Sequence, residues 1–299
     1  MRKLLLTIMA ILSAVYILPK RDPKASRGHL DNIADFPSQY VPSRGIHVWT
    51  PEDYDSTKRY DVLYMHDGFM LFDGKVTWNF QEWGVDEAMD SLIRLGKIRP
   101  TIVVGIDCNE KNRPGEYCPD DMAQYMPEGK PIYKSFKPTG NAYLRFLVEE
   151  LKPYIDSAYS TYPEREHTWI MGSSCGGLIS SYALCKYPEV FAGAACMSTH
   201  CTLTYFDDQV PDKDRIQAYR TYLKNHLHAN SALLYMDKGD QTVDMTYDKA
   251  QKAINHMLHA QGWDDEHFRY RFFPWKAHCE NDWRARLDEP LTFLLGVRD

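Results

Sequence analysis

The sequence predicts one α/β domain with a mostly parallel central sheet and helices on both faces, on three observations. Short apolar runs alternate with longer segments of helical periodicity from about residue 45 onward. Residues 101–106 form a continuous β-branched run, which is typical of a strand buried on both faces. A Gly-Ser turn at residues 172–177 joins a strand to a helix. Such alternation favours right-handed crossovers and hence a parallel sheet.

Each element is predicted from its local pattern. Strands are expected where short apolar runs stop at turn residues, at 45–50, 60–65, 101–106, 168–173, 191–197, 232–236 and 268–273. Helices are expected where apolar residues recur every three or four positions, at 83–95, at 143–160 with a kink at Pro153, from the 172–177 turn to about 186, at 214–227, at 245–260 and at 282–295. Two long insertions, about 108–140 and about 198–230, leave the carboxyl ends of strands and are expected to wall a pocket.

The N-terminal segment differs from the rest of the chain. Residues 4–18 carry no charge, are mostly apolar and follow Arg2-Lys3. Fifteen residues are short for a membrane span of about 20 and fit the core of a signal peptide. We therefore divide the chain into a signal peptide or anchor at 1–20, a polar linker at 21–39 and the folded domain at 40–299. Export to the periplasm or the medium is expected, with residues 4–18 as an uncleaved anchor the alternative; recovery from the cytosol with Met1 intact would contradict it.

Composition excludes several functions. The 299 residues carry a formal net charge of −6 and no basic stripe, which argues against a nucleic-acid partner. Seven cysteines occur without a Cys-x-x-Cys pair, so a structural zinc site is not expected and at least one thiol is free. A disulfide near Cys175 and Cys279 stays open. No metal or cofactor is expected.

Ser174 is the candidate nucleophile. It is the central serine of Gly172-Ser173-Ser174-Cys175-Gly176, which fits the pattern G-x-S-x-G. In the nucleophile elbow of α/β-hydrolases, a strained turn between strand and helix presents a serine hydroxyl above the sheet. A Gly/Ser-rich connection without a catalytic role is the alternative.

A nucleophilic serine needs a base and a third group that orients the base, and in α/β-hydrolases the chain order is serine, acid, histidine. His278, after the last expected strand, is the candidate base, and His200 is the second candidate or a pocket residue. The acid is expected after the strand at 232–236, where Asp237, Asp240 and Asp244 qualify. Asp244 is favoured, with a helix cap as its alternative role.

The developing oxyanion needs preorganised N–H donors. One is expected from the backbone N–H of Cys175 at the start of the helix after the turn. The other is expected from Gly68 or Phe69, in the loop after an early strand, where glycine permits a close approach.

The segment from about 40 to 298 resembles the esterase-D-like "putative esterase" group of α/β-hydrolases. The matching residues are Leu63-Tyr64-Met65-His66-Asp67-Gly68 with Leu71-Phe72-Asp73, Val103-Val104-Gly105-Ile106, Arg113 with Glu116-Tyr117, Glu150-Leu151-Lys152-Pro153, Gly172-Ser173-Ser174-Cys175-Gly176-Gly177, and His278 with Glu280 and Trp283. The group includes S-formylglutathione hydrolases, enterochelin-type esterases, and carbohydrate esterase family one with its acetylxylan and feruloyl esterases. Its acid aligns best with Asp244. Cys175 departs from the methionine that the group usually has, which leaves a backbone role unaffected.

The resemblance and the residues together predict a serine carboxylic-ester hydrolase, acting on acetyl or feruloyl esters of polysaccharide. A siderophore or other small ester is the alternative substrate. An acyltransferase, or a non-catalytic binding protein on the same scaffold, is the alternative function. Arg113 is expected to form a structural ion pair with Glu116-Tyr117 that fixes the first insertion, with direct substrate contact as its other reading.

Overall fold

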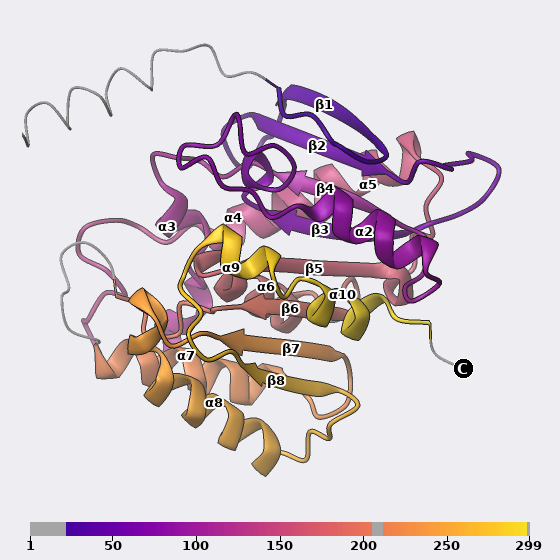
Figure 1. Cartoon of the computed structure of the whole chain (residues 1–299). Coiled ribbons are helices and arrows are strands. Elements are labelled where there is room, and N and C mark those ends of the chain that lie inside the picture. Colours follow the sequence, from indigo (N-terminus) through magenta and orange to yellow (C-terminus); the bar gives the residue numbers. More distant parts are fainter. Residues whose placement is uncertain (1–21, 205–211, 298–299) are drawn as a thin grey trace, which may run out of the picture.

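The computed structural model of the chain describes residues 22–204 and 212–297. The expected export segment, residues 4–18, lies outside the described residues. Among the described residues the strands form one eight-stranded sheet in the order β1-β2-β4-β3-β5-β6-β7-β8, which runs from β1 to β8 across Figure 1. β1, β2 and β4 pair antiparallel, and every other neighbouring pair is parallel. The predicted mostly parallel sheet is therefore confirmed.

The strands occupy the expected apolar runs, with one addition at the N-terminal edge. They are β1 (His29–Phe36), β2 (Arg44–Thr50), β3 (Asp61–His66), β4 (Thr101–Ile106), β5 (Thr168–Ser173), β6 (Gly193–Met197), β7 (Leu233–Lys238) and β8 (Phe268–Phe272).

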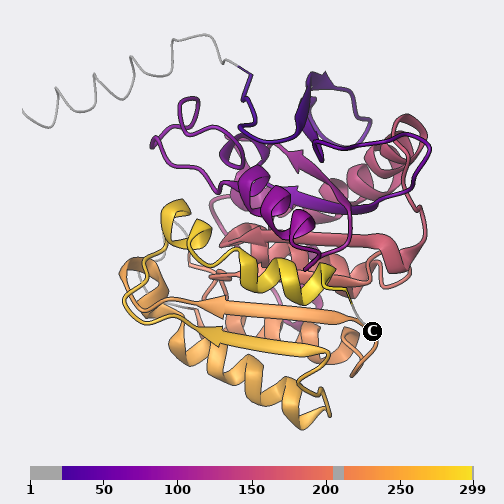
Figure 2. The same cartoon turned by 45° about the vertical axis from the view of Figure 1, so that its right-hand side comes forward.

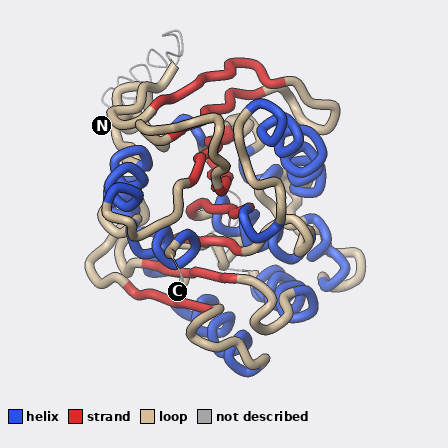
Figure 3. Tube along the Cα trace, turned by 90° about the vertical axis from the view of Figure 1, so that its right-hand side faces the viewer, coloured by secondary structure: helices blue, strands red, loops and turns tan. Residues whose placement is uncertain are grey.

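Helices cover both faces of the sheet, which Figure 3 shows edge-on and Figure 2 from an intermediate angle. They are α2 (Val85–Arg94), α3 (Arg113–Glu116), α4 (Gly140–Arg145), α5 (Lys152–Ala158), α6 (Cys175–Lys186), α7 (Lys213–His226), α8 (Asp248–Ala260), α9 (Glu280–Arg284) and α10 (Asp288–Leu295). Shorter turns include the 3₁₀ segments η1 (Gly68–Met70) and η5 (Thr242–Thr246) and the π segment η3 (Phe146–Leu151).

Strand β3 shows how the core divides into two layers. Leu63 and Met65 point to one face, where they join a cluster that includes residues of α2 and α10. Val62 and Tyr64 point to the other face and join residues of α4, α6, α7 and α8. Because successive side chains of a strand alternate between faces, an all-apolar strand needs cover on both sides. The sequence pattern therefore predicted the layered architecture.

The prediction of a linker at 21–39 is wrong for residues 29–36. These residues form β1, which pairs antiparallel with β2 at the edge of the sheet. Most β1 side chains are exposed or half-buried, because an edge strand here has one face in solvent. Most residues of β1 are polar, so a prediction based on apolar runs does not find this strand. The strand is stabilised by its backbone pairing with β2.

The long helix predicted at 143–160 is divided. A π segment, η3, lies between α4 and α5 and ends just before Pro153. Proline has no N–H to donate and crowds the preceding turn, so a local widening of the helix accommodates it. The predicted C-terminal helix is likewise split into α9 and α10.

Strained backbone gathers at the carboxyl edge of the parallel strands. Positive φ angles at residues other than glycine occur in the segments after β3, β5, β6, β7 and β8, at Asp67, Ser174, Ser198, Leu203, Thr242 and Trp275. Such angles cost on the order of 1–3 kcal/mol each and persist only where the surrounding structure enforces them. The same edge carries the candidate residues predicted from the sequence.

Candidate active site

Ser174 lies at the sharp turn between β5 and α6. Its backbone has φ 58° and ψ −121°, a conformation that L-residues rarely adopt. The turn requires glycine at 172, because a Cβ there would lie 2.8 Å from the carbonyl carbon of Gly176. The side chain of Ser174 is half-buried. The local sequence thus produces the elbow geometry that the G-x-S-x-G pattern predicts.

The segment after β6 makes hydrogen bonds to both backbone groups of Ser174. The Ser174 N–H donates to the carbonyl of Met197 at 2.9 Å, and the N–H of His200 donates to the carbonyl of Ser174 at 3.0 Å. These two bonds fix the backbone of the strained residue to the neighbouring strand. The elbow conformation is therefore imposed by the sheet as well as by its own glycines.

His278 and Asp244 are in direct contact. The distance from His278 Nδ1 to Asp244 Oδ1 is 2.6 Å. The other carboxylate oxygen accepts from the hydroxyl of Ser198 and the N–H of Gly239, both at 2.6 Å. Burial raises the pKa of Asp244, but the hydrogen bonds from His278, Ser198 and Gly239 outweigh it and lower that pKa below its usual value. Asp244 is thus an ionised carboxylate that orients His278 with Nδ1 protonated, which leaves Nε2 as the basic nitrogen.

The other two acid candidates have different partners. Asp237 is fully buried and forms an ion pair with Arg286, at 3.0 Å from Nε to Oδ2. Asp240 accepts the backbone N–H of Trp275 at 2.7 Å and so holds the loop before His278. Of the three aspartates, Asp244 is the one that the structure brings to His278.

Ser198 and Trp283 complete the surroundings of Asp244, and the sequence motifs gave neither residue a role there. The Ser198 hydroxyl accepts from Trp283 Nε1 at 3.0 Å and from Arg286 Nη2 at 2.9 Å while it donates to Asp244. The Trp283 ring meets the His278 ring edge-on, with centroids 5.0 Å apart. The position of Ser198 directly after β6 was the available signal, since strand ends at this edge meet.

His200 does not have the geometry of a base. Its Nδ1 lies 2.7 Å from the hydroxyl of Tyr247, and its Nε2 lies 2.6 Å from the carbonyl oxygen of Thr204. Burial lowers the pKa of His200 to about 4. The alternative prediction that His200 is the base is therefore wrong, because both of its ring nitrogens are engaged in hydrogen bonds. Its side chain is buried, and its ring meets the Tyr247 ring edge-on with centroids 5.6 Å apart.

The predicted oxyanion loop lies against the start of α6. Asp67 adopts a left-handed conformation and η1 follows it. A Cβ at Gly68 would lie 2.7 Å from the carbonyl carbon of Gly105, which explains the glycine. A Cβ at Gly176 would lie 3.3 Å from His66 Cβ and 3.5 Å from Asp67 Oδ2. The loop that carries Gly68 and Phe69 is therefore next to the helix that begins at Cys175.

Arg113 supports this loop instead of pairing with Glu116. Its guanidinium donates from Nε and Nη2 to the two oxygens of Asp67, at 2.6 and 2.7 Å. Glu116 instead forms a buried two-pronged pair with Arg44 at 2.8 and 3.0 Å. The predicted partner was wrong, because residues at the two ends of the one-turn helix α3 face different neighbours. Both ion pairs nevertheless tie the insertion to the sheet.

His66 lies directly behind the elbow. Its Nδ1 is 2.7 Å from the Tyr143 hydroxyl, and its Nε2 has no hydrogen-bond partner among the described residues. Burial lowers the pKa of His66 to about 3. A proton on this ring would place a charge in an enclosed site with no acceptor for it, so the ring stays neutral.

No cluster of three or more metal-ligating side chains occurs in the parts of the chain that the structure describes. None of the seven cysteines forms a disulfide, so the disulfide left open near Cys175 and Cys279 is not formed. Among residues 22–204 and 212–297, no helix is long and apolar enough to cross a membrane.

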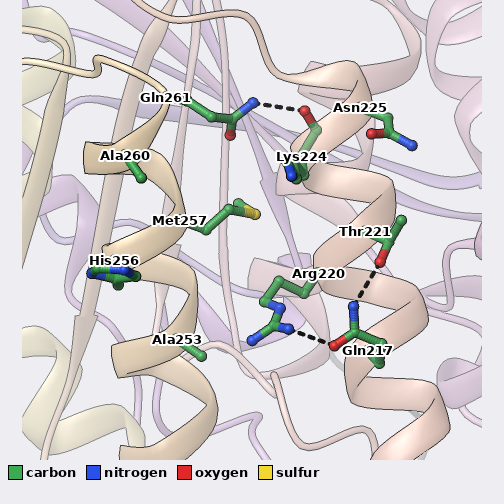
Figure 4. A pocket seen from close by; sticks show the side chains of 10 residues that line it. All are labelled: Gln217, Arg220, Thr221, Lys224, Asn225, Ala253, His256, Met257, Ala260 and Gln261. Carbon is green, nitrogen blue, oxygen red and sulfur yellow. Dashed lines mark hydrogen bonds between the residues drawn. The ribbon is translucent and has the colours of Figure 1, made fainter.

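A groove of about 480 Å³ lies between α7 and α8 (Figure 4). Arg220 lines it from α7, and His256 and Met257 line it from α8. None of the candidate catalytic residues contributes to this groove. It is therefore separate from the site at the strand ends.

Comparison with known proteins agrees with this geometry. Residues 41–294 match the family described as "Putative esterase". The chain belongs to this family. The match spans the sheet from just before β2 to α10 and includes every candidate site residue.

Curated relatives are distant. YbbA of Bacillus subtilis (strain 168), described as uncharacterized, is 24% identical over 157 residues, which are 52% of this chain and 56% of that protein. An endo-1,4-beta-xylanase/feruloyl esterase of Xylanibacter ruminicola is 23% identical over 198 residues, which are 64% of this chain and 24% of that protein. The chain spans about half the length of YbbA and a smaller share of the second relative.

Solved structures share the fold of this family member. A ferulic acid esterase superimposes with TM-score 0.63 at 20% identity, covering 89% of this chain and 96% of that one. The enterobactin esterase FES from Shigella flexneri superimposes with TM-score 0.66 at 20% identity, covering 91% of this chain and 60% of that one. The predicted α/β-hydrolase fold is therefore confirmed.

Because His66 is buried and neutral, we expect the free energy of unfolding to depend on pH in the acid range. In the unfolded chain it takes up a proton near pH 6.5, and in the folded chain only near pH 3. Between these values the unfolded state binds the extra proton, so the free energy of unfolding falls as the pH falls, by up to about 1.4 kcal/mol per pH unit. His66→Gln removes this contribution, and urea unfolding between pH 7 and pH 4 measures it.

The exposed His228 provides a matched control. His228→Gln is expected to keep the pH slope of the unmodified chain, whereas His66→Gln lowers the slope and leaves the part that buried His200 contributes. Equal slopes for the unmodified chain and His66→Gln would show that His66 is not the responsible group.

Proposed function

We propose that this protein is a serine carboxylic-ester hydrolase with Ser174 as nucleophile, His278 as base and Asp244 as acid. One observation carries the proposal. The 2.6 Å contact between His278 and Asp244 lies at the same sheet edge as the strained Ser174 turn. Family membership supports the same reaction class. A strained serine, an oriented imidazole and a buried carboxylate together form the arrangement that activates a serine hydroxyl.

In the first half-reaction, Ser174 Oγ attacks the ester carbonyl carbon while His278 Nε2 takes the hydroxyl proton. The carbonyl oxygen becomes an oxyanion, which the N–H groups of Cys175 and of Gly68 or Phe69 stabilise. The carbon–oxygen bond to the leaving alcohol then breaks, and His278 returns the proton to that alcohol. The product of this half-reaction is an acyl group on Ser174.

In the second half-reaction, water replaces the alcohol and the same groups act in reverse. His278 takes a proton from water, the hydroxide oxygen bonds to the acyl carbon, the bond to Ser174 Oγ breaks, and His278 returns the proton to Ser174 Oγ. Asp244 stabilises the imidazolium in both halves and keeps the required tautomer. No metal or cofactor takes part in either step.

Acetyl or feruloyl esters of a polysaccharide are the proposed substrates. Relatives whose names give feruloyl or ferulic acid esterase activity support this choice. Esters of a siderophore are the second candidate, which the likeness to an enterobactin esterase supports. Export guided by residues 4–18 is part of the proposal, because a polysaccharide substrate lies outside the cell.

An aromatic rim beside His278 favours a polysaccharide. We use this name for Trp78, Phe80 and Trp275, which are 64%, 75% and 82% exposed. Asn79, between the first two, donates to Glu280 at 2.8 Å, and Trp275 precedes His278 by three residues. Phe80 and Trp275 both have positive φ, at 56° and 64°. Backbone strain at residues whose large aromatic rings stay in solvent does not stabilise the fold. It therefore indicates that these rings have a binding role.

Removal of the nucleophile tests the reaction class. Ser174→Ala is expected to lower kcat for p-nitrophenyl acetate by about 10⁴-fold or more, because no other group can take the acyl chain. Ser173→Ala is the matched control and is expected to stay active. Circular dichroism checks that both variants are folded. Wild-type turnover by Ser174→Ala would refute the mechanism.

The acid is identified in the same assay. Asp244→Asn is expected to lower kcat by about 10³- to 10⁴-fold, because the amide no longer holds His278 in the reactive tautomer. Asp240→Asn changes the support of the Trp275 loop and leaves the contact between Asp244 and His278 in place, so it should lower kcat much less. The reverse ranking would assign the acid to Asp240.

The aromatic rim makes a prediction about substrate size. Trp275→Ala is expected to raise KM for an acetylated or feruloylated polysaccharide by about three- to tenfold, through loss of ring stacking, and to leave KM for p-nitrophenyl acetate unchanged. Tyr162→Ala, an exposed aromatic before the amino end of β5, is the control. An equal change in KM for both substrates would show that the aromatic rim does not bind the polysaccharide.

A further inference from the structure

We propose that Ser198 is a positioning residue that keeps Asp244 ionised behind His278, because its hydroxyl can donate only to that carboxylate. This inference rests on the proposed function, in which Asp244 must stay charged while His278 exchanges a proton. It goes beyond the three proposed catalytic residues, because it assigns the control of their protonation to a residue outside that set.

Ser198 lies between two buried carboxylates. Its backbone N–H donates to Asp237 Oδ1 at 2.9 Å, and its hydroxyl oxygen lies 2.6 Å from Asp244 Oδ2. Ser198 and both aspartates are fully buried. Two buried negative charges repel each other, and each needs hydrogen-bond donors in place of water. Ser198 therefore supplies a donor to each carboxylate from a single position in the chain.

The direction of the Ser198 hydroxyl follows from its other two partners. Trp283 Nε1 lies 3.0 Å from Ser198 Oγ, and Arg286 Nη2 lies 2.9 Å from it. Indole and guanidinium N–H groups donate and never accept, so they use both lone pairs of the hydroxyl oxygen. Among the described residues, the single hydroxyl proton is then left with Asp244 Oδ2 as its acceptor. The bond from Ser198 to Asp244 cannot reverse without breaking the other two.

This fixed direction opposes a neutral Asp244. A proton on Oδ2 would need an acceptor there, but both partners of Oδ2, the Ser198 hydroxyl and the Gly239 N–H, donate to it. A proton on Oδ1 would compete with the Nδ1–H of His278, which lies 2.6 Å away. Hydrogen bonds that a carboxylate accepts favour its charged form. When the pH falls, the proton is therefore taken up by His278 while Asp244 stays ionised.

The backbone of Ser198 is held in a strained conformation that serves this role. Its φ is 41°, in the left-handed region that residues with a side chain rarely adopt. Such a conformation costs on the order of 1–3 kcal/mol and persists only where the surrounding structure enforces it. Here the bond from the N–H to Asp237 fixes the backbone while the hydroxyl reaches Asp244. Arg286 pairs with Asp237 and also donates to the hydroxyl, so it connects both ends of this arrangement.

Loss of the Ser198 hydroxyl changes how strongly Asp244 attracts His278. In Ser198→Ala, Asp244 Oδ2 keeps the N–H of Gly239 and loses its other donor. A carboxylate with fewer donors is a stronger base and stabilises the adjacent imidazolium more. His278 then keeps its proton to higher pH. Because the proposed reaction needs neutral His278, activity on the acid side should be lost at a higher pH.

Other titratable and charged groups surround the Asp244–His278 pair, and they are the same in every variant compared below. They are Asp237, Lys238, Asp240 and Tyr270 from β7, the segment after it and β8, His200 and Cys201 after β6, Tyr247 before α8, and Lys276, Cys279, Glu280, Asp282 and Arg286 from the segment that carries His278. A difference between the variants therefore isolates the hydroxyl.

The experiment measures kcat/KM of the full-length protein for p-nitrophenyl acetate between about pH 4.5 and pH 8.5. Ser198→Ala is expected to move the acid limb of this profile to higher pH by about 0.5 to 1 unit and to leave KM on the plateau unchanged. Ser181→Ala is the matched control, because Ser181 is also buried and its hydroxyl bonds Tyr219 of α7 at 2.7 Å. It should leave the acid limb where it is.

A second variant separates the hydroxyl from the backbone strain and keeps the inference testable if Ser198→Ala does not fold. Ser198→Gly also lacks the hydroxyl, but glycine adopts a positive φ readily. It is expected to move the acid limb as far as Ser198→Ala does. An unmoved acid limb in either folded variant, whatever the change in kcat, would overturn the inference, because it would leave Ser198 with a structural role only.

An NMR titration tests the same inference without a substrate. The ring C–H signal of His278 is assigned with His278→Gln. Its titration midpoint should lie at higher pH in Ser198→Ala than in the unmodified protein, by the same amount as the acid limb. Equal midpoints would contradict the inference. Absence of p-nitrophenol release by the unmodified protein would instead refute the proposed function, and the titration would still decide the role of Ser198.

Discussion

The candidate site depends on the hydrogen bonds that the carboxylate of Asp244 accepts. This carboxylate is fully buried and accepts from His278, from the Ser198 hydroxyl and from the N–H of Gly239. These donors come from the ends of three neighbouring strands, β6, β7 and β8. A buried charge is tolerated only when its hydrogen bonds are satisfied. The carboxylate therefore fixes the relative positions of three loops that the sheet alone would leave adjustable.

A second buried charge supports the first. Arg286 pairs with Asp237 and also donates to the Ser198 hydroxyl. The position of Ser198, which donates to Asp244, is therefore fixed by this second buried charge. Trp283 donates to the same hydroxyl and packs its ring on His278. His278 is thus held by both a polar and an aromatic contact. Such layered support keeps a reactive geometry rigid without a metal or disulfide in the described part of the chain.

Much of the fold and part of the site were predictable from the sequence. The parallel strands, the Ser174 turn and the region of the acid follow from apolar runs, glycine spacing and chain order. The polar edge strand β1 and the π segment before Pro153 were missed, because backbone pairing and helix widening leave little trace in residue type. The partner of Arg113 was also missed, since Asp67 lies 46 residues away in the chain.

The sequence by itself determined the elbow, because the glycines at 172 and 176 and the strand before them are local requirements. It also placed several polar residues at strand ends, and parallel strands bring those ends to one edge. Only the tertiary structure decided which of them meet. Asp237, Asp240 and Asp244 lie within eight residues, yet one pairs with Arg286, one holds a loop and one contacts His278. Side-chain direction and burial, which depend on distant residues, made that choice.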